Sequence, residues 1–283
     1  MILVTGAAGK TGLAVTSALK QRGASVRALI RHADQEGAVL TAGAAEGVIA
    51  DLQNAGQLIR AMRGIAAVYL ICPNVHPYEL SIGATAISAA KLSGVRRLVY
   101  HSVLFPDVEA MPHHWQKFQV EKALKRSGFE YTILQPASYM QNILPYWEGI
   151  TAAGEYRVPY SVDAVFTPLE LGDVAEVAAT VLGSDGHAGR TYALAGPQPL
   201  TSAQMADEIA DLLGREVHAQ QQSIQEWRAG AKKAGLNPYA IDALQRMFSY
   251  YDRHGFAGSS KTLEGLLGRP PSRFSEFLAR LEK

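Results

Sequence analysis

The chain of 283 residues is long enough to bury a large hydrophobic core, as one large domain or two smaller ones. Hydrophobic residues make up 48% of it and charged residues 19%, and the formal net charge of +1 at pH 7 implies no polyanionic partner. We therefore expect no nucleic-acid binding and, because no apolar run approaches about 20 residues, no membrane span. Cys72 is the only cysteine, which excludes an intramolecular disulfide and, with no charged leader at the start, indicates a cytoplasmic protein.

The chain opens with a short apolar run, residues 2–4, which is typical of a buried strand. Gly6, Gly9 and Gly12 follow, and an amphipathic helix begins near Thr11. A strand, a glycine turn and a helix in this order bind the pyrophosphate of a dinucleotide, because the turn lets the backbone approach the phosphates and the helix N-terminus offers free N–H groups. The spacing is G-x-x-G-x-x-G, and the alternative is a tight turn without a ligand.

Strands and helices then alternate. We predict strands over residues 25–30, 45–50, 66–71, 97–100 and 131–135, and helices over residues 54–62, 78–93 and 115–127. Short strands that are apolar on both faces and joined by helices are typical of an α/β fold with a doubly wound parallel sheet of the Rossmann type. Ligands bind such sheets at the carboxyl ends of the strands. After the glycine turn, the residues to watch at this edge are Arg31, Asp51, Cys72, Ser102 and Pro136.

The later part of the chain predicts several helices separated by short loops. Residues 201–204 and 223–226 each have the pattern of a capping box. Asn237 and Pro238 have the residue types of an N-cap and a first helical position.

We accordingly expect an NAD(P)-binding Rossmann domain over residues 1–150 and a smaller, mostly helical lobe for substrate or partner over residues 151–283, covering the ligand edge of the sheet. Residues 189–194 have the pattern of a strand that could return to the main sheet. The aromatic residues near 248–251 suit either the core or an interface, so a homodimer or a protein partner stays possible.

The end of the second predicted strand indicates which dinucleotide binds. NAD-preferring sites place a carboxylate there to accept hydrogen bonds from the ribose hydroxyls, but this strand ends in Arg31 and His32. A guanidinium at Arg31 suits a 2′-phosphate in charge and geometry, which favours NADP, as NADPH, over NAD. The alternative is a solvated surface arginine. Asp51 suits either a hydrogen bond from the adenine amino group or an N-cap of the following helix.

Six stretches of the sequence carry a family resemblance: TGAAGKTG, ALIR, SGVRRLVYHS, KFQVEKALKRSGFEYTILQP followed by SYMQN, LGDVAEVAA and GRPPSRFSEFLA. With them, nearly the whole chain resembles the NmrA-like group of atypical, extended-type short-chain dehydrogenase/reductases, which includes quinone reductases and triphenylmethane-dye reductases. The resemblance implies a cofactor site made of Gly6, Ala8, Gly9, Lys10, Thr11, Gly12, Arg31, Asp51, Leu52, Cys72, Pro73, Lys117 and Pro136.

The resemblance also implies a partial catalytic set. Lys117 and Glu121 match the K-x-x-x-E of extended members, and Ser102 takes the place of the serine that polarises a carbonyl. The tyrosine position four residues before the lysine holds His113, and no Y-x-x-x-K occurs elsewhere. His113 either shares a helix face with Lys117 and supplies a proton, or precedes the helix without a chemical role. Lys117 either contacts the nicotinamide ribose or is a solvated helix lysine.

Three residues after the last of these predicted strands are candidates for the acceptor pocket: Tyr139, Asn142 and Trp147. The two aromatic ones suit the core equally well. Cys72 reads more simply as a small buried hydrophobic residue. The histidines at 101, 113 and 114 lack the spacing of metal ligands, so we expect no metal.

Two functions remain open on the sequence. The first is an NADPH-dependent oxidoreductase that passes hydride to a conjugated small-molecule acceptor such as a quinone or dye. The second is an NAD(P)(H)-binding redox sensor that performs no chemistry and regulates a protein partner, a hypothesis that the missing tyrosine motivates.

Overall fold

The computed structural model describes residues 1–281, which fall into two compact units. The first unit comprises residues 1–107, 114–135 and 171–192, and the second comprises residues 108–113, 136–170 and the chain from residue 193 onward. The predicted boundary at residue 150 stays a prediction, and residues 282–283 of the predicted second lobe lie outside the described residues.

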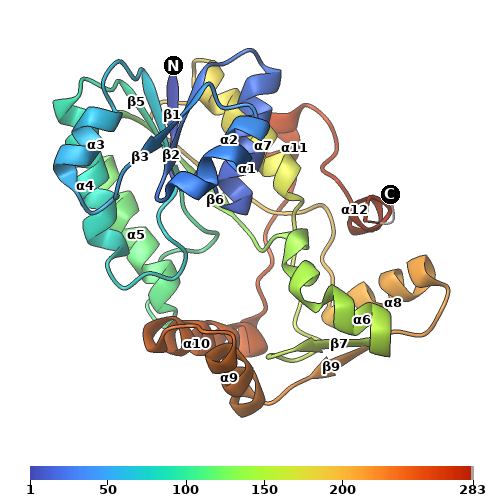
Figure 1. The fold of residues 1–283 in the computed structure, drawn as a ribbon. Coiled ribbons are helices and arrows are strands. Elements are labelled where there is room, and N and C mark those ends of the chain that lie inside the picture. Colours follow the sequence, from blue (N-terminus) through green and yellow to red (C-terminus); the bar gives the residue numbers. More distant parts are fainter. Residues whose placement is uncertain (282–283) are drawn as a thin grey trace. The chain divides into compact units, whose positions relative to one another are not determined.

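A seven-stranded sheet runs through the first unit (Figure 1). Its strands, in spatial order, are β3 (Glu46–Ile49), β2 (Val26–Ile30), β1 (Ile2–Val4), β4 (Ala67–Leu70), β5 (Arg97–His101), β6 (Glu130–Pro136) and β8 (Arg190–Leu194). Strands β3 to β6 are parallel, with Val4 opposite Ala28 on one side and Tyr69 on the other. The strand order reverses between β1 and β4, which is where such sheets bind ligands. The predicted Rossmann-type α/β fold is confirmed.

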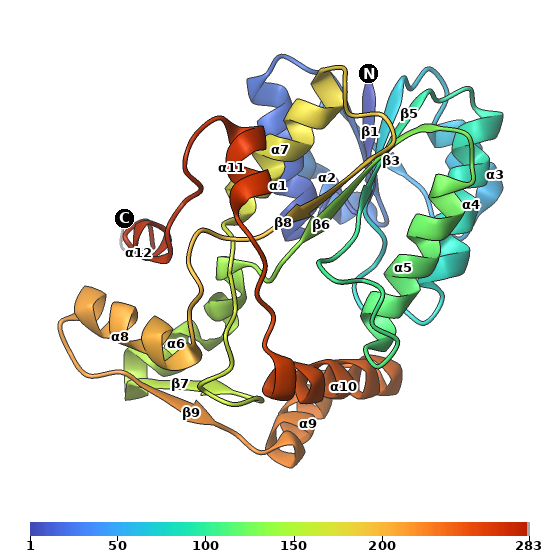
Figure 2. The ribbon, with the colours of Figure 1, turned by 180° about the vertical axis from the view of Figure 1, so that it is seen from behind.

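Helices cover both faces of this sheet (Figures 1 and 2). On one face, α1 (Lys10–Gln21) packs against α7 (Leu171–Gly183), beside the short α2 (Glu36–Thr41). On the other lie α3 (Ala55–Ala61), α4 (Glu79–Leu92) and α5 (Pro112–Lys125). Gly83 of α4 allows the close approach of α5, because a Cβ there would lie 2.6 Å from the Val120 side chain. Their apolar residues join those of the strands in one buried cluster.

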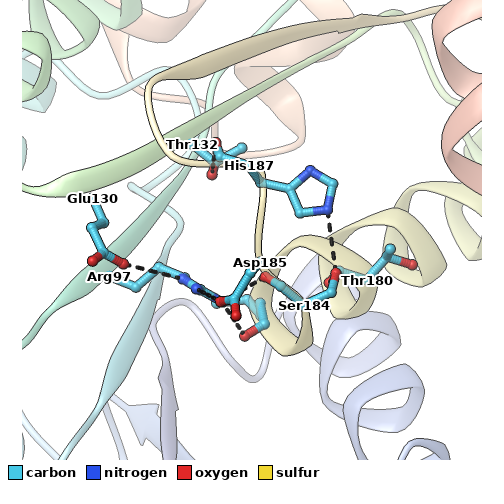
Figure 3. A network of polar contacts seen from close by, with 8 residues as sticks. Arg97, Glu130, Thr132, Thr180, Ser184, Asp185 and His187 are labelled. Atoms are coloured by element: carbon cyan, nitrogen blue, oxygen red, sulfur yellow. Dashed lines mark hydrogen bonds and ion pairs between the residues drawn. The ribbon is translucent and has the colours of Figure 1, made fainter.

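The amino edge of the sheet is held by a polar network around Arg97, at the start of β5 (Figure 3). The Arg97 guanidinium donates to the carbonyl oxygens of Leu182 (3.1 Å) and Ser184 (2.8 Å) and to the Asp185 carboxylate (2.8 Å). Thr132 of β6 donates to the His187 carbonyl oxygen at 2.9 Å. These bonds fix the end of α7 and the following loop, so that β8 lies beside β6 although 53 residues separate Pro136 from Arg190.

The second unit contains the 3₁₀ segment η2 (Met140–Tyr146) and the helices α6 (Trp147–Ala153), α8 (Ser202–Leu213), α9 (Ile224–Lys233), α10 (Pro238–His254), α11 (Lys261–Leu267) and α12 (Phe274–Leu278). Both predicted capping boxes form, at Thr201 and Ser223, and Asn237 caps α10 with Pro238 in its first turn. The unit also holds a two-stranded parallel sheet, β7 (Glu155–Val158) and β9 (His218–Gln221), which we did not predict. The reason is that HAQQ in β9 has no apolar alternation.

Aromatic residues form the core of the second unit. The ring of Tyr160 lies 4.9 Å from that of Phe166, 5.9 Å from Phe248 and 6.5 Å from Tyr251, and Phe248 also contacts Trp227. The aromatic residues of α10 therefore serve at least in part as core. Within residues 1–281, no helix is both long enough and apolar enough to cross a bilayer.

Candidate functional site

The glycine turn connects β1 to α1 at the point where the strand order reverses. Gly6 has a positive φ of 56°, and the Gly9 N–H donates to the Gly6 carbonyl oxygen at 3.0 Å. A Cβ on Gly12 would overlap the Gly6 carbonyl oxygen and lie 2.5 Å from the Ala7 Cα, so only glycine fits there. Gly9 caps α1 without a side-chain hydrogen bond, which leaves the first N–H groups of the helix for an anion.

Arg31 lies beside this turn, directly after β2. The Ala7 N–H donates to the Leu29 carbonyl oxygen at 3.4 Å, which joins the turn to the end of that strand. The Gln35 side chain accepts from the Arg31 N–H at 2.8 Å and holds the backbone. The Arg31 side chain is exposed, and within residues 1–281 its guanidinium has no hydrogen bond or ion pair. Its contact with a 2′-phosphate stays a prediction.

Asp51 follows β3 and is exposed. Its carboxylate accepts from the Gln53 N–H at 2.9 Å, a local turn, whereas the N-cap of α3 is Asn54, which accepts from the Gln57 N–H at 3.0 Å. The alternative that Asp51 caps the helix is therefore wrong, because the helix begins one turn later, and the adenine contact stays a prediction.

Two further predicted cofactor residues are mostly buried. Leu52 is 9% exposed and Cys72 is 5% exposed, and both belong to the apolar cluster of the first unit. Burial and the nearby Glu79 carboxylate raise the pKa of the Cys72 thiol, so it stays protonated and unreactive at neutral pH. Cys72 is a small buried hydrophobic residue, in agreement with the simpler interpretation of the sequence, and any cofactor contact it makes is one of packing.

A buried ion pair lies behind the carboxyl end of β5. The Lys117 Nζ of α5 lies 2.6 Å from the Glu79 Oε1 of α4, and the Glu79 side chain is fully buried. The Tyr100 hydroxyl donates to the same oxygen at 3.1 Å, and Lys117 also donates to the His101 carbonyl oxygen at 3.5 Å. Lys117 is thus not the solvated lysine of the alternative interpretation. Its ammonium is fixed by a carboxylate that the sequence analysis did not single out.

Ser102 follows β5 and is held by a second buried carboxylate. Its hydroxyl donates to the Glu121 Oε1 at 2.5 Å, and the Gln135 amide donates to the same oxygen at 2.8 Å. A hydroxyl has one proton, so in this arrangement Ser102 offers acceptor lone pairs to its other neighbours. Its predicted role in polarising a carbonyl would require that proton to turn away from Glu121.

Two neutral histidines lie close to these residues. His101 Nδ1 is 2.7 Å from the Tyr69 hydroxyl, and His114 Nδ1 is 3.1 Å from the Phe105 carbonyl oxygen. Burial, with a smaller contribution from the Lys117 cation, lowers the pKa of His101 to about 3. Burial likewise lowers the pKa of His114 to about 4. Both imidazoles are therefore uncharged in the folded chain at neutral pH.

The depressed pKa values predict acid sensitivity. Below the ordinary histidine pKa of 6.5 the unfolded chain binds protons that the folded chain refuses, so stability falls as the pH drops from 6.5 toward 4. Each histidine is expected to lower the free energy of unfolding by on the order of 2 kcal/mol between pH 7 and pH 5. Urea unfolding of the wild type and of His101→Gln at both pH values measures this loss of stability. The loss between pH 7 and pH 5 should be about half as large in the variant. His218→Gln, at an exposed site, should leave it unchanged; equal slopes in all three proteins would contradict the assignment.

The predicted residues His113, Pro136, Tyr139, Asn142 and Trp147 belong to the second unit. His113 lies in the first turn of α5, which begins at Pro112 and not at Trp115, so the alternative that it precedes the helix is wrong; proline is favoured at such a start. Pro136 ends β6.

The three candidate acceptor residues of this unit are not buried. Tyr139 caps η2 and Trp147 begins α6, both half-buried, while Asn142 is exposed. The two aromatic side chains are therefore not fully buried core residues, and their acceptor contacts stay predictions.

Comparison with known proteins shows the family of this chain. The model of the NmrA-like family matches residues 1–278. A (4-alkanoyl-5-oxo-2,5-dihydrofuran-3-yl)methyl phosphate reductase of Streptomyces griseus is 31% identical over 99% of this chain and 97% of its own. An NAD(P)H azoreductase of Xenophilus azovorans is 28% identical over 98% and 96%. The crystal structure of an NADPH-dependent quinone oxidoreductase of Escherichia coli complexed with NADPH has a TM-score of 0.88 and 28% identity, covering all of both chains.

Proposed function

Because the chain belongs to the NmrA-like family, we propose that it is an NADPH-dependent oxidoreductase that transfers hydride to a conjugated small-molecule acceptor such as a quinone. The observation that carries the proposal is the exposed guanidinium of Arg31 beside the glycine turn, which within residues 1–281 has no hydrogen bond or ion pair. Full-length similarity to proteins named as an azoreductase, a quinone oxidoreductase and a dihydrofuranyl methyl phosphate reductase supports the same reaction class.

The residues at the switch point fit NADPH. Gly12 lets the start of α1 pack against the backbone of the glycine turn, where any side chain would collide, and the uncapped start of α1 offers N–H donors to the pyrophosphate. Arg31 would pair with the 2′-phosphate, since no carboxylate stands at the end of β2 to select NAD. When bound, NADPH supplies the hydride.

The chain's own contribution is position and proton supply. The Glu79 carboxylate fixes the Lys117 ammonium, which we expect to contact the nicotinamide ribose. The buried Cys72 thiol stays protonated and therefore takes no part in the proposed chemistry. A quinone that gains hydride becomes a stabilised anion, so its proton comes either from His113 or from solvent. A cytoplasmic location, where a lone cysteine stays reduced, suits this chemistry.

Loss of NADPH absorbance with a quinone and with a cationic dye tests the proposal. The wild type should oxidise NADPH in preference to NADH, and Arg31→Ala should lose about 10- to 100-fold of that preference, because a charge-assisted hydrogen bond contributes roughly 1.5–3 kcal/mol. Arg126→Ala removes an exposed arginine at the opposite edge of the sheet and should keep the preference.

Two other outcomes would redirect the assignment. An unchanged cofactor preference in Arg31→Ala would remove Arg31 from the cofactor site. Tight NADPH binding without turnover of any acceptor would favour the redox sensor, for which the substitution of the catalytic tyrosine by His113 and the engagement of the Ser102 proton by Glu121 are the supporting observations. Capture of a protein partner that depends on the bound nucleotide would then be the next measurement.

A further inference from the structure

Backbone strain is concentrated at the carboxyl edge of the sheet. Among residues 1–281, two residues other than glycine have a positive φ: Val75, at 46°, and Phe105, at 48°. Val75 lies in the loop after β4, a strand at the switch point, and Phe105 lies in the loop after β5, the neighbour of β4. Branched and aromatic residues adopt this conformation only when their surroundings impose it, and such outliers gather at ligand sites.

Phe105 is turned outward between two anchored neighbours. Leu104 is 2% exposed and Pro106 is buried, whereas the Phe105 side chain is among the exposed large hydrophobic ones, at 43%. The Phe105 side chain is thus partly accessible to a ligand, whereas its two neighbours are buried. The strained conformation thus keeps an aromatic ring at the surface, where burial alone would not place it.

Side chains of helix α5 stabilise this strained conformation. The fully buried His114 imidazole donates from Nδ1 to the Phe105 carbonyl oxygen at 3.1 Å, and burial lowers the pKa of His114 to about 4, so this donor is neutral and constant across neutral pH. Lys117, one turn further along the same face of α5, donates to the His101 carbonyl oxygen at 3.5 Å. Adjacent helical side chains therefore hold both ends of the segment 101–105, which contains Ser102.

We propose that Phe105 is a specificity-determining residue that binds the acceptor, its ring stacking on the flat face of a conjugated acceptor molecule at the carboxyl edge of the sheet. The inference rests on the proposed function and adds to it a residue and a ligand shape. A planar π-system is the ligand that an aromatic face recognises best, through offset stacking and apolar contact. A saturated or non-planar acceptor would gain little from the same ring.

Kinetics with menadione and NADPH test the role of the ring. Phe105→Gly and Phe105→Ala should each raise the KM for menadione by about tenfold while leaving the KM for NADPH unchanged. Phe105→Tyr, which keeps an aromatic face, should retain the wild-type KM. Leu92→Ala, at a 75% exposed apolar residue at the other edge of the sheet, is the matched control and should change neither constant.

The same variants test the strain separately from activity. Glycine is the residue that tolerates a positive φ, so Phe105→Gly should melt at a Tm about 2–4 °C above that of Phe105→Ala, although neither has a ring. Equal Tm values would refute the strain.

The two proposals fail in different ways. A wild-type enzyme that oxidises NADPH with menadione, with an unchanged menadione KM in both ring-less variants, would refute acceptor binding by Phe105 alone. No oxidation by the wild type would refute the proposed function itself. Calorimetric titration of menadione into the NADP⁺-loaded protein then decides on Phe105 without turnover: weaker binding to Phe105→Gly supports the role, and equal binding overturns it.

Discussion

Lys117→Met is expected to lower the free energy of unfolding by about 3–5 kcal/mol, because it leaves the Glu79 carboxylate buried without its cation. Glu79 is 0% exposed, and its remaining donor among the bonds described above is the neutral Tyr100 hydroxyl. Removing one partner of a buried ion pair costs far more than the apolar stem of methionine returns. Urea unfolding at pH 7 measures the loss.

A double variant separates the effect of the buried charge from the loss of packing. Glu79→Gln with Lys117→Met removes both charges and should recover most of the stability lost in the single variant, which makes the pair strongly non-additive. Arg246→Met breaks an exposed pair with Asp242, at 3.0 Å and with both side chains more than half exposed, and should cost no more than about 0.5 kcal/mol. If the double variant were no more stable than Lys117→Met, a buried ion pair would not be the reason for the loss.

Gly12→Ala is expected to weaken NADPH binding by about 100-fold, since the added methyl overlaps backbone atoms of the glycine turn and not a side chain that can move aside. The atoms in its way are the Gly6 carbonyl oxygen and the Ala7 Cα, so α1 must move away from β1 and carry its N–H donors out of position. Isothermal titration calorimetry with NADPH measures the loss of affinity.

Gly37→Ala is the matched control for this substitution. Gly37 also lies near the start of a helix, α2, but a Cβ there meets nothing within 4 Å and its φ is not positive. NADPH affinity should be unchanged, and the free energy of unfolding should rise by about 0.5–1 kcal/mol, the usual gain for alanine in a helix. Wild-type affinity in Gly12→Ala would show that the pyrophosphate binds elsewhere.

Local patterns in the sequence determined the sheet and many of the helix boundaries. Apolar runs such as 66–71 become buried strands because both faces of a parallel sheet are covered. The capping boxes at Thr201 and Ser223 form because their partners lie three residues away in the chain. The glycines at 6 and 12 could be assigned for the same reason: the strand, turn and helix that need them are contiguous.

Tertiary structure alone decided the surroundings of the catalytic candidates. Glu79 reads in the sequence as an acidic residue in the first turn of a helix, and only packing brings it to Lys117, 38 residues away. Ser102 follows β5 and Glu121 lies in α5, so only packing brings the two side chains together. The positive φ of Phe105 could not be predicted from the sequence, because aromatic residues rarely adopt it. Local hydrogen bonds and periodicity are encoded in neighbouring residues, whereas burial, desolvation and the partner of a buried charge depend on which elements pack together, and those decide what each side chain does at the site.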